Sequence, residues 1–270
     1  MAATAAEAAG TVRRAWYTLA TAFRLQLRLS VATPNYLSSV FFQPALMAIL
    51  AGLVFEVAGK AEAVEFAAVG AGMFGVWNSN LHASAGIIQG ERRYHTLEFL
   101  VTTRSPLFLV ILGKTVAAAA FSLLSLGVCV GVVAVGFGRP LQVASVWVLL
   151  LGVAVSMAAV TVVGLLLSSL AVTTRHYWRL FDFFYLVFIL SGLLFPVELL
   201  PRPIQPLSYL LPTTWSAGLV RAGLGTAESG RWLVYAVGAV ATTAAYLVAA
   251  LGVYSVVIRV ARVEARLARY

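Results

Sequence analysis

The sequence has few charged residues and almost no cysteine. Only 11% of its 270 residues are charged, whereas soluble globular domains have about 25%. Cys129 is the one cysteine and lies within an apolar run, which excludes an intramolecular disulfide framework. Hydrophobic residues make up 61% of the chain, and the mean hydropathy is +0.93. This composition predicts an all-α integral membrane protein that crosses the bilayer several times.

The chain also has too few acidic residues to balance its basic ones, and its net charge is +9. A basic protein can bind nucleic acid, but such a site needs basic residues gathered on one face. Here the basic residues are scattered between apolar runs. We therefore expect membrane lipids as partners and no nucleic acid.

Six apolar segments are long enough to cross a bilayer, which takes about 20 residues. They run approximately over residues 36–57, 64–88, 107–135, 143–170, 180–195 and 232–258. An even number of spans puts both termini on the same side of the membrane. The sequence has no fixed-period repeat and no low-complexity linker, so we expect a single domain over residues 1–270.

The distribution of basic residues predicts the orientation of these spans in the membrane. With both termini in the cytoplasm, 14 of the 19 basic residues lie in inner segments, and the positive-inside rule favours this arrangement. The outer segments keep Lys60, Arg139, Arg202, Arg221 and Arg231. Residues 12–30 have apolar positions at helical spacing, which predicts an amphipathic helix at the cytoplasmic membrane surface within residues 1–35. A solvated helix leading into the first span is the alternative. The richness in Ala, Val and Arg suggests a bacterial source, and hence a bacterial inner membrane.

One polar stretch, residues 90–106, interrupts the apolar first half of the chain. It reads GERRYHTLEFLVTTRSP and must lie outside the hydrocarbon, on the cytoplasmic side by the distribution of basic residues. Such a segment is where a membrane protein can meet a soluble partner. Glu91 and His95 within it are spaced like two metal ligands, but no third ligand is near. Pairs with this spacing are common on solvated helices, so we expect no metal site.

The second predicted span is unusually polar. Asn78, His82 and Gln89 share one helical sector, and polar groups in hydrocarbon usually face the interior of the bundle. Two interpretations stay open, hydrogen bonding between helices and the lining of a substrate path. For the substrate path we select Trp77, Asn78, His82 and, in the fifth span, Ser191.

Asp182 lies one turn inside the fifth predicted span. An acidic residue inside a span is a functional candidate by default. Arg179, however, precedes it by three residues and lies at a depth from which an arginine reaches the interface. We therefore expect a structural ion pair between Arg179 and Asp182.

Residues 196–217 are rich in proline and yet apolar. Proline has no amide donor and ends helices, so this segment cannot be one straight span. Broken backbone at membrane depth is stable only where protein covers it. We predict a re-entrant pair of short helices that dips in from the outer face, with a plain external loop as the alternative.

No pattern in the sequence indicates catalysis or nucleotide binding. Gly113-Lys114-Thr115 ends like a phosphate-binding loop, but the glycine required five residues earlier is Phe108. Only three histidines are present, and they form no Ser/His/Asp or Cys/His set. We expect no enzymatic activity and no cofactor bound by this chain.

Two stretches carry motifs that can be compared with a known family. The first contains Glu91, Arg92, Thr96, Leu97, Glu98, Leu100, Ser105 and Pro106, and the second is FPVELLPRPIQPLSYLLPTTW from Phe195. They resemble the pattern E-R-E-x-G-T-L-E-x-L, then a small residue and Pro, and the pattern F-P-hydrophobic-acid-x-L-P, of the permease subunit of type-2 ABC exporters. Arg93 replaces the second acid of the first pattern and His95 replaces its glycine.

The resemblance implies a dimer of six-span permeases, with an identical or paralogous second copy. Two copies of a separate ABC ATPase would support the dimer, and they would bind the ATP and Mg. Residues 90–106 would then be a coupling helix. Its ATPase-coupling residues would be Glu91, Arg92, Arg93, Thr96, Leu97 and Glu98. The outer gate would contain Phe195, Pro196, Glu198, Pro201 and Trp215.

The expected function is export of a hydrophobic or amphipathic substrate, such as a drug-like natural product or a lipid conjugate. An ionic substrate would need counter-charges inside the membrane, and the candidate path has few. Export of a lipid-linked glycan or polysaccharide is the nearest alternative, although such exporters need a wide channel lined by aromatic residues. Alternatives from other classes are a secondary transporter, which should have broken helices in both halves, and a membrane scaffold without transport activity.

Overall fold

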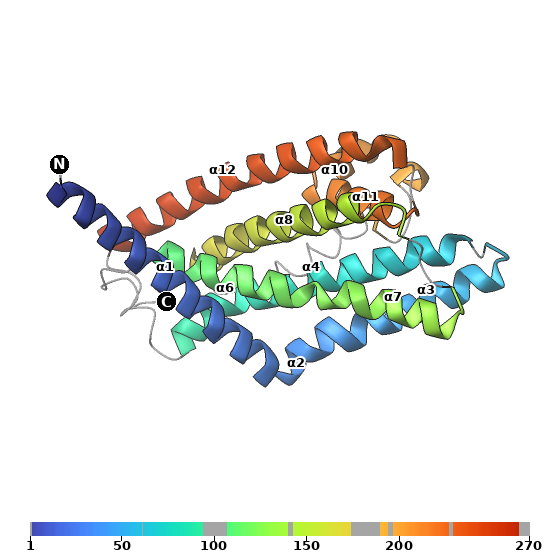
Figure 1. The fold of residues 1–270 in the computed structure, drawn as a ribbon, viewed down its shortest axis with the longest axis horizontal. Coiled ribbons are helices and arrows are strands. Elements are labelled where there is room, and N and C mark those ends of the chain that lie inside the picture. Colours follow the sequence, from blue (N-terminus) through green and yellow to red (C-terminus); the bar gives the residue numbers. More distant parts are fainter. Residues whose placement is uncertain are drawn as a thin grey trace.

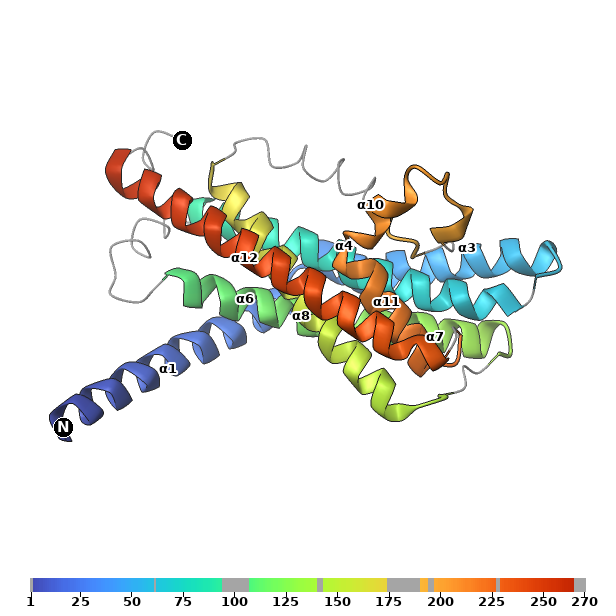
Figure 2. The ribbon, with the colours of Figure 1, turned by 90° about the horizontal axis from the view of Figure 1, so that it is seen from above.

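The computed structural model describes residues 2–60, 62–93, 107–139, 143–173, 190–193, 197–226 and 229–264. In these ranges the regular secondary structure is entirely helical, which confirms the predicted all-α class. The long helices form one bundle (Figure 1). The start of α1 (Ala2–Ala32) and the end of α12 (Trp232–Glu264) lie at the same end of this bundle (Figure 2). Which side of a membrane this end faces stays a prediction.

Helix α1 is an arm that lies along α6 (Leu107–Ser122). Its buried stripe consists of small and polar side chains at successive turns, Ala22, Gln26 and Ser30, whereas Trp16 and Tyr17 are exposed. Small side chains allow two helices to approach closely. The predicted N-terminal helix is therefore present, and its location at a membrane surface stays a prediction.

The first predicted span is a continuous helical rod with a wide turn in it. After extended backbone at Thr33, it comprises α2 (Pro34–Leu37), a π-helical turn at Ser38–Phe42, and α3 (Gln43–Val57). Pro44 explains the wide turn, because proline has no amide hydrogen and its ring clashes with the carbonyl four residues earlier. The amide of Gln43 donates instead to the carbonyl of Ser38, five residues back.

Helix α4 (Glu62–Arg93) is the central helix of the bundle. Every residue from Ala67 to Leu81 is buried. The helix is covered by α3, α6, α7 (Leu124–Gly136), α8 (Val146–Thr173) and α11 (Pro212–Gly223). Because protein surrounds it there, the middle of α4 would not meet lipid and can carry polar residues that have partners.

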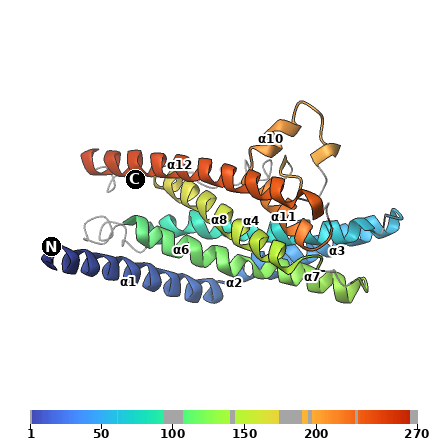
Figure 3. The same cartoon turned by 45° about the horizontal axis from the view of Figure 1, so that its top comes forward.

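Helix α12 lies at the periphery of the bundle, against α8 and α11 (Figure 3). Its outward face is apolar and exposed, with Val234, Val237 and Val248 each more than half accessible. This is the pattern expected of a helix whose outer face meets hydrocarbon.

Two short helices precede α12, and both begin within residues 196–217. The first, α10 (Gln205–Tyr209), follows a single 3-10 turn at Val197–Leu199 and projects from the bundle (Figure 3). The second, α11, is inside the bundle, and all of its residues except Thr214 and Trp215 are buried. Whether this pair enters the hydrocarbon from the outer face stays a prediction.

Four helical stretches in the described part of the chain are long and apolar enough to span a membrane. They are Pro34–Val57, Phe108–Gly136, Val146–Ser168 and Trp232–Val256, and they match the first, third, fourth and sixth predicted spans. The second predicted span is helical in α4, but its Asn and His residues lower its hydropathy. The fifth lies outside the described residues except for its last turn, so the count of six stays a prediction.

Candidate functional site

The polar residues of α4 make contacts in different directions. The Asn78 side-chain amide donates to Oε1 of Gln43 on α3 at 2.8 Å. Nδ1 of His82 lies 2.7 Å from the Asn78 carbonyl oxygen, one turn away in the same helix. Trp77 instead packs with side chains of α6 and α8, including Ala119 and Val160. The structure thus places Asn78 and His82 together, and turns Trp77 toward other helices.

A second polar pair on α4 faces α8. The Asn80 amide donates to the carbonyl of Val160 at 2.8 Å, and the Ser168 hydroxyl donates to the carbonyl of Ser84 at 2.8 Å. Between them, a Cβ on Gly164 would overlap the Ser84 hydroxyl and come within 3.0 Å of the Asn80 amide. The two helices therefore approach closely because position 164 is glycine.

These contacts leave hydrogen-bonding capacity unused in the middle of the bundle. Among the described residues, Oδ1 of Asn80, Oγ of Ser84 and Nε1 of Trp77 are buried side-chain atoms without a hydrogen-bond partner. Buried polar atoms are normally paired, and each exception needs an explanation, such as a water or a ligand. Of these three groups, Oδ1 of Asn80 can accept a hydrogen bond, Nε1 of Trp77 can donate one, and the Ser84 hydroxyl can do either.

Ser191 belongs to a different region from Asn78 and His82. Its carbonyl accepts a hydrogen bond from Oγ1 of Thr214 on α11 at 3.0 Å. Leu193, two residues later, meets α4 at Gly70, and eight residues of helix separate Gly70 from Asn78 by about 12 Å. The structure therefore groups Ser191 with the residues around α11.

Trp215 ties α11 to α10. Its Nε1 donates to the carbonyl of Tyr209 at 2.7 Å, and the two rings lie 5.3 Å apart between centroids. Glu198 and Pro201, which the sequence predicts in the same gate, are exposed on the segment before α10. Phe195 and Pro196 lie outside the described residues. The gate assignment therefore stays a prediction.

Arg221 is a residue that the sequence analysis did not select. It lies in the last turn of α11 and is 6% exposed, although the count of basic residues assigned it to an outer segment between two spans. Its guanidinium donates to the carbonyl oxygens of Gly192 and Leu193 and stacks on the ring of Phe66. One signal was available, since it is the only charged residue among the small and apolar residues of α11.

The family profile of the ABC-2 type transporter matches residues 17–224, most of the chain. The chain belongs to the ABC-2 type transporter family. It is thus the membrane-spanning permease component of a type-2 ABC transporter, and its family implies an ABC ATPase as partner. A search of curated proteins gave no match to the chain.

For this ABC-2 permease, the described residues include only the start of the predicted coupling segment. Glu91, Arg92 and Arg93 form the last turn of α4. Thr96, Leu97 and Glu98 lie outside the described residues, as do Arg179 and Asp182 of the predicted ion pair. Permeases of this family are membrane transport components that are generally not catalytic, in line with the failed phosphate-loop pattern at Lys114.

Proposed function

We propose that this permease is the membrane-spanning subunit of an ATP-driven exporter that works by alternating access. It would move a hydrophobic or amphipathic substrate, such as a drug-like natural product or a lipid conjugate, out of the cytoplasm. Two ATPase subunits would bind ATP and Mg and power a pair of permeases. The observation that supports this mechanism best is the continuity of α4 from one end of the bundle to the other.

Helix α4 has 32 residues, which corresponds to a length of about 48 Å. Its last turn carries Glu91, Arg92 and Arg93, which open the coupling segment, and its first turns carry Phe66 and Gly70, which contact the region around α11. A helix transmits a displacement along its axis as a rigid body. A shift that the ATPase imposes at residues 90–106 would therefore reach the outer end through α4.

The chemistry of α4 supports the proposed substrate class. No acidic or basic residue stands between Glu65 and Glu91 if His82 is neutral. The unpaired buried atoms of Asn80 and Ser84 supply polar contacts without charge. Such a surface suits a largely apolar molecule with one or two hydrogen-bonding groups, and gives no counter-charge to an ion.

Transport in inside-out vesicles tests the direction and the energy source. Vesicles that contain the permease and its ATPase should accumulate lipophilic fluorescent dyes on addition of ATP, and vanadate should stop this. Accumulation in right-side-out cells would contradict export. Transport that resists vanadate would indicate a secondary transporter, and an ATPase that responds to no ligand would indicate a scaffold.

The coupling segment has its own test. Glu98→Lys and Leu97→Lys should separate ATP hydrolysis from dye transport, because either change alters the surface that meets the ATPase. Membrane insertion should remain at the wild-type level. Wild-type transport by either variant, with the ATPase still bound, would remove the coupling role from residues 90–106.

A further inference from the structure

The described outer part of the bundle contains one buried arginine that joins three separate elements. Arg221 on α11 donates from Nη1 to the Gly192 carbonyl at 3.2 Å and from Nη2 to the Leu193 carbonyl. Its guanidinium carbon lies 3.6 Å from the centroid of the Phe66 ring on α4. One side chain therefore connects α11, the turn at residues 191–193, and α4.

The backbone of α4 and the turn at residues 191–193 approach each other closely beside Arg221. A Cβ at Gly70 would overlap the carbonyl oxygen of Leu193 and come within 3.2 Å of Nη2 of Arg221. Only a glycine at this position of α4 lets the turn come close enough to present its carbonyl to the guanidinium.

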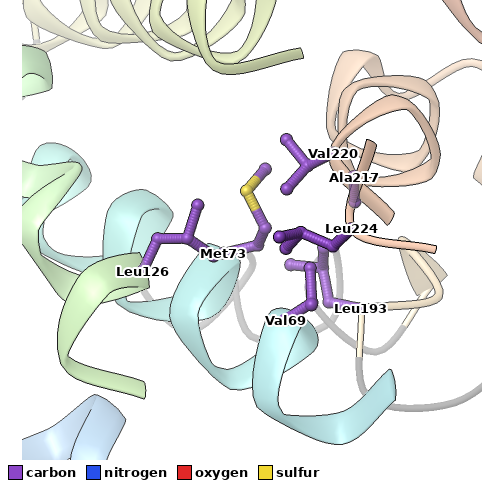
Figure 4. Packing of buried hydrophobic residues seen from close by; sticks show 7 residues of the cluster. All are labelled: Val69, Met73, Leu126, Leu193, Ala217, Val220 and Leu224. Atoms are coloured by element: carbon purple, nitrogen blue, oxygen red, sulfur yellow. The ribbon is translucent and has the colours of Figure 1, made fainter. Parts of the chain in front are cut away.

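Arg221 lies at the edge of an apolar contact that we call the outer seam. Its buried members are Val69 and Met73 of α4, Leu126 of α7, Leu193, Ala217 and Val220 of α11, and Leu224. In Figure 4 the residues of α4 and α7 lie opposite those of α11, and Leu193 lies beside them. Apolar side chains give such a contact little directional preference, so the seam needs a polar group to fix one arrangement.

The partners of Arg221 are suited to a contact that must open. Within the described part of the chain, its hydrogen-bond acceptors are neutral carbonyl oxygens, and Nε has no partner. The exposed carboxylate of Glu198 attracts the guanidinium electrostatically. Bonds from a charged donor to neutral carbonyls are strong while the site is dry. A buried ion pair would instead leave an uncompensated carboxylate on separation, whereas released carbonyls can turn to water.

We propose that Arg221 is the latch of the outer seam. In the resting protein it holds α11 and the turn at residues 191–193 against α4, and movement of α4 during the transport cycle breaks this contact so that the seam opens outward. The role in the cycle rests on the proposed export function. The resting latch itself does not depend on which substrate is carried.

Cysteine accessibility at the seam tests the latch. Val69 is fully buried in the seam, and Val69→Cys is nearly isosteric, so it serves as reporter in a Cys129→Ala background. A membrane-impermeant maleimide is added to right-side-out membrane vesicles that contain the complex with its ATPase and no nucleotide. Without nucleotide turnover, the reporter should label very slowly. Arg221→Met should increase the labelling rate at least about tenfold, as when an open state rises from about 1% to about 10% of the population.

Two further variants keep the test informative if Arg221→Met does not assemble. Phe66→Leu removes the ring under the guanidinium and leaves both carbonyl bonds, so labelling should rise by less than in Arg221→Met. Arg221→Lys retains a charged donor and should stay closest to the wild type. Arg202→Met is the matched control, because Arg202 is exposed on the segment before α10, and its labelling should not change. Unchanged labelling in both Arg221→Met and Phe66→Leu would overturn the latch.

Labelling of the complex with its ATPase arrested distinguishes the resting latch from its proposed role in transport. The reporter with an intact Arg221 is labelled in membranes with ATP and vanadate, which arrests the ATPase. Faster labelling supports outward opening at this seam. If trapping has no effect while Arg221→Met still exposes the reporter, the latch exists but the proposed opening of this seam during transport is wrong.

Discussion

Helices α4 and α12 are both long, but α4 is buried inside the bundle whereas α12 is exposed at its periphery. Helix α4 is enclosed by protein through its middle and carries Asn78, Asn80 and His82 there. In α12 only 11% of the most apolar window is buried, and its outward residues are valine and leucine. Hydropathy in this protein therefore does not report membership of the bundle, because α4, its most central helix, is not among the stretches apolar enough to span a membrane. The exposed apolar face of α12 is the one that we expect to meet lipid.

The first way to test this comparison is to place the same charge on each helix. Val76→Arg in α4 would bury a guanidinium without a partner, which costs several kcal/mol, and we expect no assembled protein. Val248→Arg on α12 should cost about 2.5–3.5 kcal/mol and leave a protein that assembles, because the long side chain can reach the interface. Size-exclusion chromatography of detergent extracts measures both. The reverse order would show that protein, and not lipid, covers this face of α12.

Replacement of a glycine by alanine should lower stability in α8, where it packs on α4, and raise stability in α12. Gly164→Ala in α8 places a Cβ against Ser84 and Asn80 of α4, and we expect a loss of about 1–3 kcal/mol through overpacking. Gly252→Ala in α12 meets nothing within 4 Å, and it should stabilise the helix by about 0.5–1 kcal/mol. The temperature at which half of the protein loses its monodisperse peak reports both changes. Equal effects would mean that α4 and α8 do not approach closely at Gly164.

The smallest expected difference concerns single hydrogen bonds. Asn80→Ala removes the bond between α4 and the Val160 carbonyl of α8, which should cost about 0.6–2 kcal/mol. Thr242→Ala in α12 removes a bond that stays within its own helix, to Gly238 at 2.7 Å, and should change stability by less than about 0.5 kcal/mol. The same thermal assay distinguishes them. A larger loss for Thr242→Ala would give α12 a polar role that the structure does not indicate.

The sequence predicted the helical class and the spans that carry uninterrupted apolar runs. The length of an apolar run can be counted directly in the sequence, without knowledge of tertiary contacts. The burial of α4 was predicted as a tendency of its polar residues to face inward, from Asn78 and His82. The direction of Asn80 and Ser84 toward α8 was missed, because helical spacing says which residues share a face and not which neighbour that face meets.

Arg221 was missed for a similar reason. A basic residue in a short segment between two spans reads as solvated, and the count of charges by side of the membrane treats it so. Its burial arises from the packing of α11 between α4, α8 and α12, which no local pattern encodes. Lys114 shows the same limit, since the sequence places it within the third predicted span but does not say which neighbours bury it, and on α6 it is only 5% exposed.

The wide turn before Pro44 has a consequence for changes in chain length. A π turn holds one residue more than an α turn, so it is equivalent to a single-residue insertion in the first span. Removal of one residue there, such as Ser38, would restore a regular α-helix and leave the N-terminal arm nearly in place. If all the residues were kept and wound as a regular α-helix, as Pro44→Ala would allow, everything before them would rotate by about 100° around the axis of α3. The bend at Thr33 would then point elsewhere, and the stripe of Ala22, Gln26 and Ser30 would lose its place on α6. In this permease the length of one turn decides where the N-terminal arm lies.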